Sequence, residues 1–206
     1  MTHALHRKVP DKETDYVLMM RSSKGINRAG AGAKLLRYLE RIEPLGPVNY
    51  GNPADGTILR VDSGAIKKNI TDESNLHIVF KDAESARKAV EIAREMDAGL
   101  SVTLTGPFER IRTLAEEMGL GIDSVQIDLG TIGKTPFDSV TEGILSLCGH
   151  MRVSKHLVRE MRRKVQAGEV DPETAAREIG KVCLCGCFNP HAAGKLLGGQ
   201  KKTDGE

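Results

Sequence analysis

Apolar residues in the first two thirds of the chain recur with the two periods of regular secondary structure. Strands are expected where residues are continuously apolar or alternate with polar ones, over 16–20, 57–61, 76–80, 100–105 and 125–129. Helices are expected where apolar positions follow the helical period, over 33–42, 83–96 and 107–119. The Pro-, Gly- and Asn-rich segment 44–56 is expected to be a long loop.

The order of these elements indicates the fold class. The first six run strand, helix, strand, strand, helix, strand, and the alternating strands are polar on one face. This pattern is typical of an α+β fold, the two-layer, ferredoxin-like βαββαβ sandwich, which one further helix and strand would extend here. A three-layer parallel sheet is the alternative, but its strands would be apolar on both faces.

Only helical patterns follow residue 134. Four helices are expected, each opened by a capping residue: Asp138 to about Leu147, Ser154 to Gly168, Asp171 to Gly180 and Asn189 to Leu197. The sequence therefore predicts an α/β sandwich domain over 1–134, a helical cysteine-containing unit over 135–199, and a disordered polar tail over 200–206.

Composition and charge narrow the class of protein. The formal net charge is only +2 and aromatic residues make up 3% of the chain, too few for a base-stacking platform, so we expect no nucleic-acid partner. No apolar run approaches the roughly 18 residues of a membrane-spanning helix. The N-terminus lacks the apolar core of a secretory signal. These features predict a soluble, cytoplasmic protein without membrane association.

The four cysteines are the feature that points most directly to chemistry. Cys183, Cys185 and Cys187 fall within five positions, and Cys148 lies 35 residues before the first of them. All four fall outside the expected helices, and thiolates are soft ligands that suit iron and zinc. In a reducing cytoplasm, clustered thiols are more often ligands or redox groups than structural disulfides. The cysteines therefore predict a metal site, with a [4Fe–4S] cluster as the first interpretation.

Other interpretations of the same cysteines stay open. Three thiolates with His150 or His191 could hold a zinc ion. Cys183 and Cys185 could cycle through a disulfide, and all four cysteines could be small buried core residues. His150, which follows Cys148 by two residues, could also donate a hydrogen bond to a cluster sulfur.

Two further expectations concern the surroundings of this site. A negatively charged cluster could be offset by six basic residues: Arg152, Lys155, Arg159, Arg162, Arg163 and Lys164. His77, on an expected strand, and His156, on a basic helix, are expected to be ordinary surface residues.

A glycine-rich turn, residues 22–32, joins the first strand to the first helix. The backbone N–H groups of Gly25 and Gly30 could converge on a phosphate, with Lys24 and Arg28 to neutralise its charge. The turn matches neither the Walker motif nor G-x-G-x-x-G. The alternative is a permissive connection between a strand and a helix.

These observations predict an iron–sulfur protein that acts in electron transfer, or in redox or cofactor support of an anaerobic enzyme system. Its partner would be a redox protein or an enzyme. The alternatives are a ligand-binding or regulatory module with a structural zinc site, and a CxC thiol oxidoreductase. The sequence does not decide whether the protein is itself an enzyme.

Overall fold

The computed structural model describes residue 7 and residues 12–122, 137–148, 150 and 152–199. The strands are β1 (Tyr16–Arg21), β2 (Asn49–Asn52), β3 (Gly56–Thr57), β4 (Asn75–Phe80) and β5 (Ser101–Thr105). The α-helices within these residues are α1 (Ala31–Ile42), α2 (Ser63–Lys68), α3 (Ala83–Met96), α4 (Phe108–Glu117), α5 (Ser139–Ser146), α6 (Lys155–Gln166), α7 (Pro172–Gly180) and α8 (Pro190–Gly198). The protein is therefore a mixed α and β fold, as the sequence predicts.

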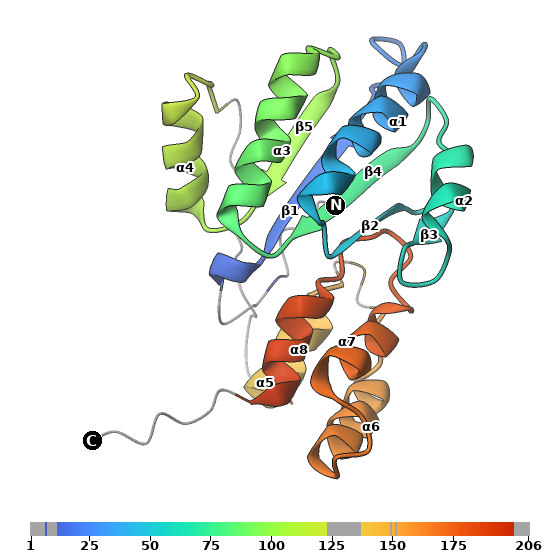
Figure 1. Ribbon diagram of the computed structural model, residues 1–206, viewed down its shortest axis with the longest axis vertical. Coiled ribbons are helices and arrows are strands. Elements are labelled where there is room, and N and C mark those ends of the chain that lie inside the picture. Colours follow the sequence, from blue (N-terminus) through green and yellow to red (C-terminus); the bar gives the residue numbers. More distant parts are fainter. Residues whose placement is uncertain (1–6, 8–11, 123–136, 149, 151, 200–206) are drawn as a thin grey trace.

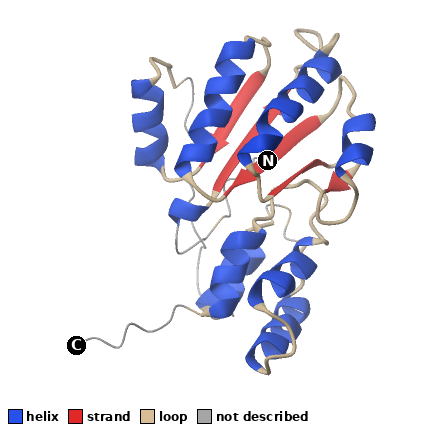
Figure 2. Ribbon diagram, in the orientation of Figure 1, coloured by secondary structure: helices blue, strands red, loops and turns tan. Residues whose placement is uncertain are grey.

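The five strands form one antiparallel sheet in the order β3-β2-β4-β1-β5. Helices α1 and α3 lie over one face of this sheet, and α5 to α8 gather at one of its ends (Figure 1). Figure 2 shows the same division by element type, with every strand in the upper part of the view.

Two hydrophobic cores flank the sheet because successive side chains of a strand point to opposite faces. Leu18 and Ile78, paired across β1 and β4, belong to the core beneath α1 and α3. Their neighbours Val17 and Val79, also paired, belong to the core that contains the cysteines and the C-terminal helices. This double burial explains why residues 16–20 of β1 are continuously apolar. The second core also connects the helical unit to the sheet.

The second strand is where the sequence prediction is wrong. β2 has the sequence Asn-Tyr-Gly-Asn and lies inside the segment 44–56 that was expected to be a loop. The expected strand 57–61 contributes only its first residue to β3, which is two residues long. All four residues of β2 are buried, so tertiary packing rather than intrinsic strand preference fixes this segment. Helix α2, capped by the Asp62 side chain, was not predicted.

The other described elements agree with the expected ones to within a few residues. Aspartates cap three of these helices, since Asp82, Asp138 and Asp171 accept hydrogen bonds from the backbone of Ser85, Thr141 and Thr174. The caps predicted at Asp138 and Asp171 are thereby confirmed. The strand expected over 125–129 and the tail expected over 200–206 lie outside the described residues. Among the described helices, none has the length and apolar character needed to cross a membrane.

Candidate metal centre

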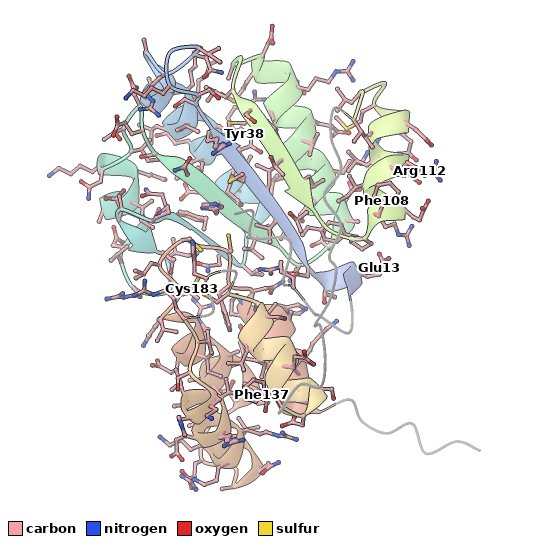
Figure 3. All side chains as sticks on the ribbon, turned by 180° about the vertical axis from the view of Figure 1, so that it is seen from behind. Glu13, Tyr38, Phe108, Arg112, Phe137 and Cys183 are labelled. Carbon is pink, nitrogen blue, oxygen red and sulfur yellow. The ribbon has the colours of Figure 1, made fainter. Side chains whose placement is uncertain are left out.

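The four cysteines lie where the helical unit meets the sheet. Cys148 follows the end of α5 by two residues, and the other three occupy residues 183–187 between α7 and α8, which we call the cysteine loop. Figure 3 shows Cys183 at this junction. None of the four is in a disulfide, and each is 0% exposed. They are therefore shielded from water and from any bulky substrate.

The thiols of the two loops are in contact. Cys183 Sγ lies 3.6 Å from Cys185 Sγ. Cys148 is hydrogen-bonded to Cys183, and Cys185 to Cys187. The two loops therefore converge, as the four-thiolate interpretation requires.

This convergence is not a ready-made metal site. Within the part of the chain that the structure describes, no three or more His, Cys, Asp or Glu side chains are already set as ligands for a metal ion. The donor set nevertheless fits a thiophilic metal, because it offers four soft sulfur atoms that are shielded from water. Binding would require the thiols to turn about their Cα–Cβ bonds.

Burial and mutual hydrogen bonds raise the pKa of three of the thiols, those of Cys148, Cys183 and Cys185. The hydrogen bond to Cys183, followed by burial, raises the pKa of Cys148. The hydrogen bond with Cys148 lowers the pKa of Cys183, but the bond with Cys185 and burial outweigh it, so that this pKa is raised. For Cys185, the lowering effect of Cys183 is outweighed by the bond with Cys187 and by burial, which raise its pKa to about 12. A metal that binds these sulfur atoms must therefore displace protons.

Backbone N–H groups of the cysteine loop are directed at two of the sulfur atoms. The N–H of Phe188 hydrogen-bonds to Cys183, and that of Cys187 hydrogen-bonds to Cys185; each lowers the pKa of its thiol. Hydrogen bonds of this kind stabilise thiolates and tune the potentials of metal–sulfur centres. The loop is therefore folded to favour negative charge on sulfur, although burial opposes it.

Gly186 allows the cysteine loop to lie directly against β2. Its φ is +89°, and a Cβ there would come within 2.6 Å of the backbone nitrogen of Gly51 and 3.0 Å of the carbonyl carbon of Tyr50. Only glycine combines this left-handed backbone with so close an approach. The loop ends where Asn189 caps α8 by accepting a hydrogen bond from the N–H of Ala192.

A buried arginine joins the two cysteine-bearing segments. Arg7 is 5% exposed, and its Nη1 donates to the carbonyl oxygens of Leu147 at 2.7 Å and Cys187 at 2.8 Å. Its Nε and Nη2 donate to the Asp15 carboxylate at 2.7 and 2.5 Å. Burial lowers the pKa of Arg7, but Asp15 outweighs this effect and raises it, so the guanidinium stays charged.

Two buried asparagines add further hydrogen bonds around the cysteine loop. Asn49 of β2 donates its amide to the carbonyl oxygen of Phe188 at 2.9 Å, and Asn189 donates to the carbonyl oxygen of Thr14 and to Asp15 at 2.8 and 2.9 Å. The Oδ1 of Asn49 is buried without a hydrogen-bond partner among the described residues. A buried oxygen without a hydrogen-bond donor is unusual, so the amide of Asn49 is only partly satisfied beside the cysteine loop.

Sequence reasoning missed Arg7, Asp15 and Asn49 and used Asn189 only as the start of a helix. Arg7 is isolated from any periodic segment, and Asn49 falls in the segment expected to be a loop. The one usable signal is that Asp15 directly precedes a strand that is apolar on both faces, where a buried carboxylate demands a cation.

The histidines and basic residues near the cysteines lie differently from expectation. His77 is 2% exposed, so its assignment to the surface is wrong: it shares a strand face with Val79, which belongs to the core that contains the cysteines. His150 is exposed and His191 is half-buried; the backbone N–H of His150, with that of Arg152, hydrogen-bonds to the Cys148 sulfur. Their roles as ligands stay predictions.

Three of the six basic residues that were expected to offset cluster charge are paired elsewhere. Arg162 contacts Asp138 at 2.9 Å, Arg163 contacts Glu160 and Glu169, and Lys164 contacts Glu160. A cation that does act on the thiols is Arg7, whose charge interacts with Cys187 and Cys183.

The glycine-rich turn directs its N–H groups at a carboxylate of the chain itself. The N–H groups of Gly30 and Gly32 donate to Asp72 at 2.9 and 2.7 Å, and Arg28 is paired with Glu73 at 3.0 Å. Lys24 and Gly25 are exposed. A phosphate would have to displace Asp72 to reach these donors, so the geometry favours a structural turn.

Comparison of the chain with protein-family models, with curated proteins and with solved structures finds no match.

Proposed function

We propose that this chain is an iron–sulfur protein in which Cys148, Cys183, Cys185 and Cys187 hold a [4Fe–4S] cluster. The observation that carries the proposal is the convergence of four buried, free thiols from two loops 35 positions apart. Four cysteine thiolates are the usual ligand set of such a cluster. The backbone N–H groups that already face three of the sulfurs would support its negative charge.

The complete burial of the thiols favours electron transfer over substrate chemistry. A bulky substrate cannot reach sulfur atoms that are 0% exposed, whereas an electron can cross a thin layer of protein. The role proposed is therefore electron transfer, or redox or cofactor support of an anaerobic enzyme system, with a redox protein or enzyme as partner. A reducing cytoplasm is the compartment that would keep these thiols free.

The test is metal and sulfide analysis of protein purified without oxygen. We expect brown protein with about four irons and four sulfides per chain. The Cys185→Ser variant should lose most of this iron, while a change in the glycine-rich turn, such as Lys24→Ala, should not. Colourless protein that contains one zinc per chain would reject the cluster.

A single tetrahedral zinc ion is the second candidate because of the distance between two thiols. Two sulfurs that share one zinc lie about 3.8 Å apart, close to the 3.6 Å between Cys183 and Cys185. In a cubane cluster each cysteine binds a different iron, and the sulfurs must separate further. Replacement of the metal by Co²⁺ would distinguish the cases, since a single tetrathiolate site takes up one Co²⁺ per chain.

The same contact supports a third candidate, a thiol oxidoreductase. Oxidation of Cys183 and Cys185 would form one S–S bond and release two protons and two electrons to a disulfide or quinone acceptor. Incubation of metal-free protein with oxidised glutathione tests this candidate. Formation of a Cys183–Cys185 disulfide at a stoichiometry near one would favour it, and persistence of all four thiols would reject it.

We also propose that the sandwich has ferredoxin-like topology. Without the short β3, the strands lie in the order β2-β4-β1-β5 and all neighbours are antiparallel. β1 and β2 are therefore parallel to each other with β4 between them, which is the arrangement of a split βαβ unit. Such a fold serves many functions, so it does not add to the case for a cluster.

A further inference from the structure

Arg7 lies between the two segments that carry the cysteines. One of its nitrogens, Nη1, donates to the carbonyl of Leu147, the residue before Cys148, and to the carbonyl of Cys187. A single side chain therefore bridges both segments. Arg7 is thus placed to hold the two loops together whether or not a metal is bound.

The contact with Cys187 also orients a peptide group toward a thiol. The carbonyl of Cys187 and the N–H of Phe188 belong to the same peptide unit and, because that unit is trans, point in opposite directions. The carbonyl binds Arg7 at 2.8 Å, and the N–H hydrogen-bonds to the sulfur of Cys183. Hydrogen bonds in such a chain polarise one another, so the guanidinium strengthens the donor that faces the sulfur.

Asp15 fixes the orientation of the Arg7 guanidinium group. It binds the Nε–Nη2 edge of the guanidinium through two hydrogen bonds and leaves Nη1 to the two carbonyls. Asn189 holds the Asp15 carboxylate in place with a third bond of 2.9 Å. The ion pair is neutral as a whole, but its positive end faces the cysteine loop.

We infer that Arg7 is a positioning residue of the cysteine site, which joins the Cys148 segment to the cysteine loop and orients the Cys187–Phe188 peptide so that its N–H faces the Cys183 sulfur. This inference rests on the proposed four-thiolate centre for its consequence, but its geometry is a property of the metal-free chain. It makes Arg7 a part of the site.

The experiment compares Arg7→Met, Arg7→Lys and the double variant Arg7→Met/Asp15→Asn with wild type. The double variant guards against simple unfolding, since it does not leave the Asp15 carboxylate buried without its cation. Arg110→Met is the matched control, because Arg110 is an exposed arginine that pairs with Glu13 at 3.1 Å. Two readouts are taken: metal affinity with the midpoint potential of any cluster, and amide hydrogen exchange of Phe188 in metal-free protein.

We expect Arg7→Met and the double variant to weaken metal binding by roughly 10- to 100-fold, as the loss of a group that supports ligands does. A cluster should also show a lower midpoint potential, since a positive charge that favours the reduced form is gone. In metal-free protein the Phe188 N–H should exchange roughly tenfold faster, because the opposite end of its peptide has lost a charge-assisted bond. Arg7→Lys should restore part of each effect, and Arg110→Met should change none.

Two results would overturn the inference. One is a folded double variant whose metal affinity, potential and Phe188 exchange all equal those of wild type. The other is equal loss in Arg7→Met and Arg110→Met. If wild type binds no metal, the proposed function fails, and the Phe188 exchange rate alone then decides whether Arg7 orients this peptide.

Discussion

The glycine-rich turn and the cysteine loop are both irregular segments that lead into a helix, and each contains a glycine with positive φ. In the turn, N–H groups from Gly30 and Gly32 are bound by the carboxylate of Asp72, and Lys24 is exposed. In the cysteine loop and the residue that follows it, carbonyls are bound by Arg7 and Asn49. The N–H groups there are turned toward sulfur.

The difference shows how to judge a loop that is rich in candidate ligands. A loop whose donors are bound by its own chain has no donor left for an external anion without a rearrangement. A loop whose outer polar atoms are fixed by other segments presents its inner atoms in a defined arrangement. The cysteine loop is of the second kind, because Arg7 and Asn49 fix carbonyls of the loop and of the residue that follows it.

The largest contrast between the two loops should appear in metal binding. Cys148→Ser removes one of four soft donors and should weaken metal binding by at least about 100-fold. Lys24→Ala, in the glycine-rich turn, should leave it unchanged. Metal content after dialysis and competition with a chelator measure both. Retention of full metal content by Cys148→Ser would confine the site to the cysteine loop.

The regular elements could be predicted because their signals are local. Apolar spacing placed α3 and α6, and aspartate caps marked α5 and α7. β2 could not be predicted, since its burial depends on the cysteine loop that packs on it. The convergence of Cys148 with Cys183 could be proposed from the sequence, but it depends on how α5 packs against α6 and α8, which local patterns do not encode. The role of Arg7 could not be found, because the two carbonyls that it binds lie 140 and 180 positions away.

The buried cysteines should make the stability of the metal-free protein depend strongly on pH, with stability falling as pH rises. Folding raises the pKa of Cys148, Cys183 and Cys185 above the ordinary 9.0. As pH rises above 9, the unfolded chain loses these protons first, so the free energy of unfolding falls. Each thiol contributes about 1.4 kcal/mol per pH unit until its folded pKa is reached.

Urea unfolding of metal-free protein between about pH 8 and 11 would measure this loss. The metal-bound protein is the control: its sulfurs have already lost their protons, so the same loss should be absent. Stability of the metal-free protein that is flat across this range would mean that the thiols are not buried as described.

A matched pair of glycine substitutions tests how tightly each loop is held. In Gly186→Ala, the alanine must adopt the left-handed backbone of residue 186, and its Cβ lies against the β2 backbone. This substitution should lower the free energy of unfolding by roughly 2–5 kcal/mol. Gly25→Ala has a similar φ of +79°, but nothing lies within 4 Å of its Cβ, so only about 1–2 kcal/mol is expected. Chemical denaturation of metal-free protein compares the two. Equal costs would show that the cysteine loop is not pressed against β2.

The smallest effect is expected at Asp72. The N–H groups of Gly32 and Gly30 lower the pKa of its carboxyl group, so its contribution to stability is present above pH 3.8 and is lost as pH falls through the lowered value. Asp72→Asn should reduce the midpoint of thermal unfolding slightly at neutral pH, and the difference from wild type should shrink in acid. Glu73→Gln removes a neighbouring exposed carboxylate and is the control.

Inorganic phosphate tests the same turn from the other side. It should not raise the thermal unfolding midpoint of wild type, because Asp72 already binds the N–H groups of Gly30 and Gly32. A phosphate-dependent rise that Lys24→Ala and Arg28→Ala abolish would instead make this turn an anion site.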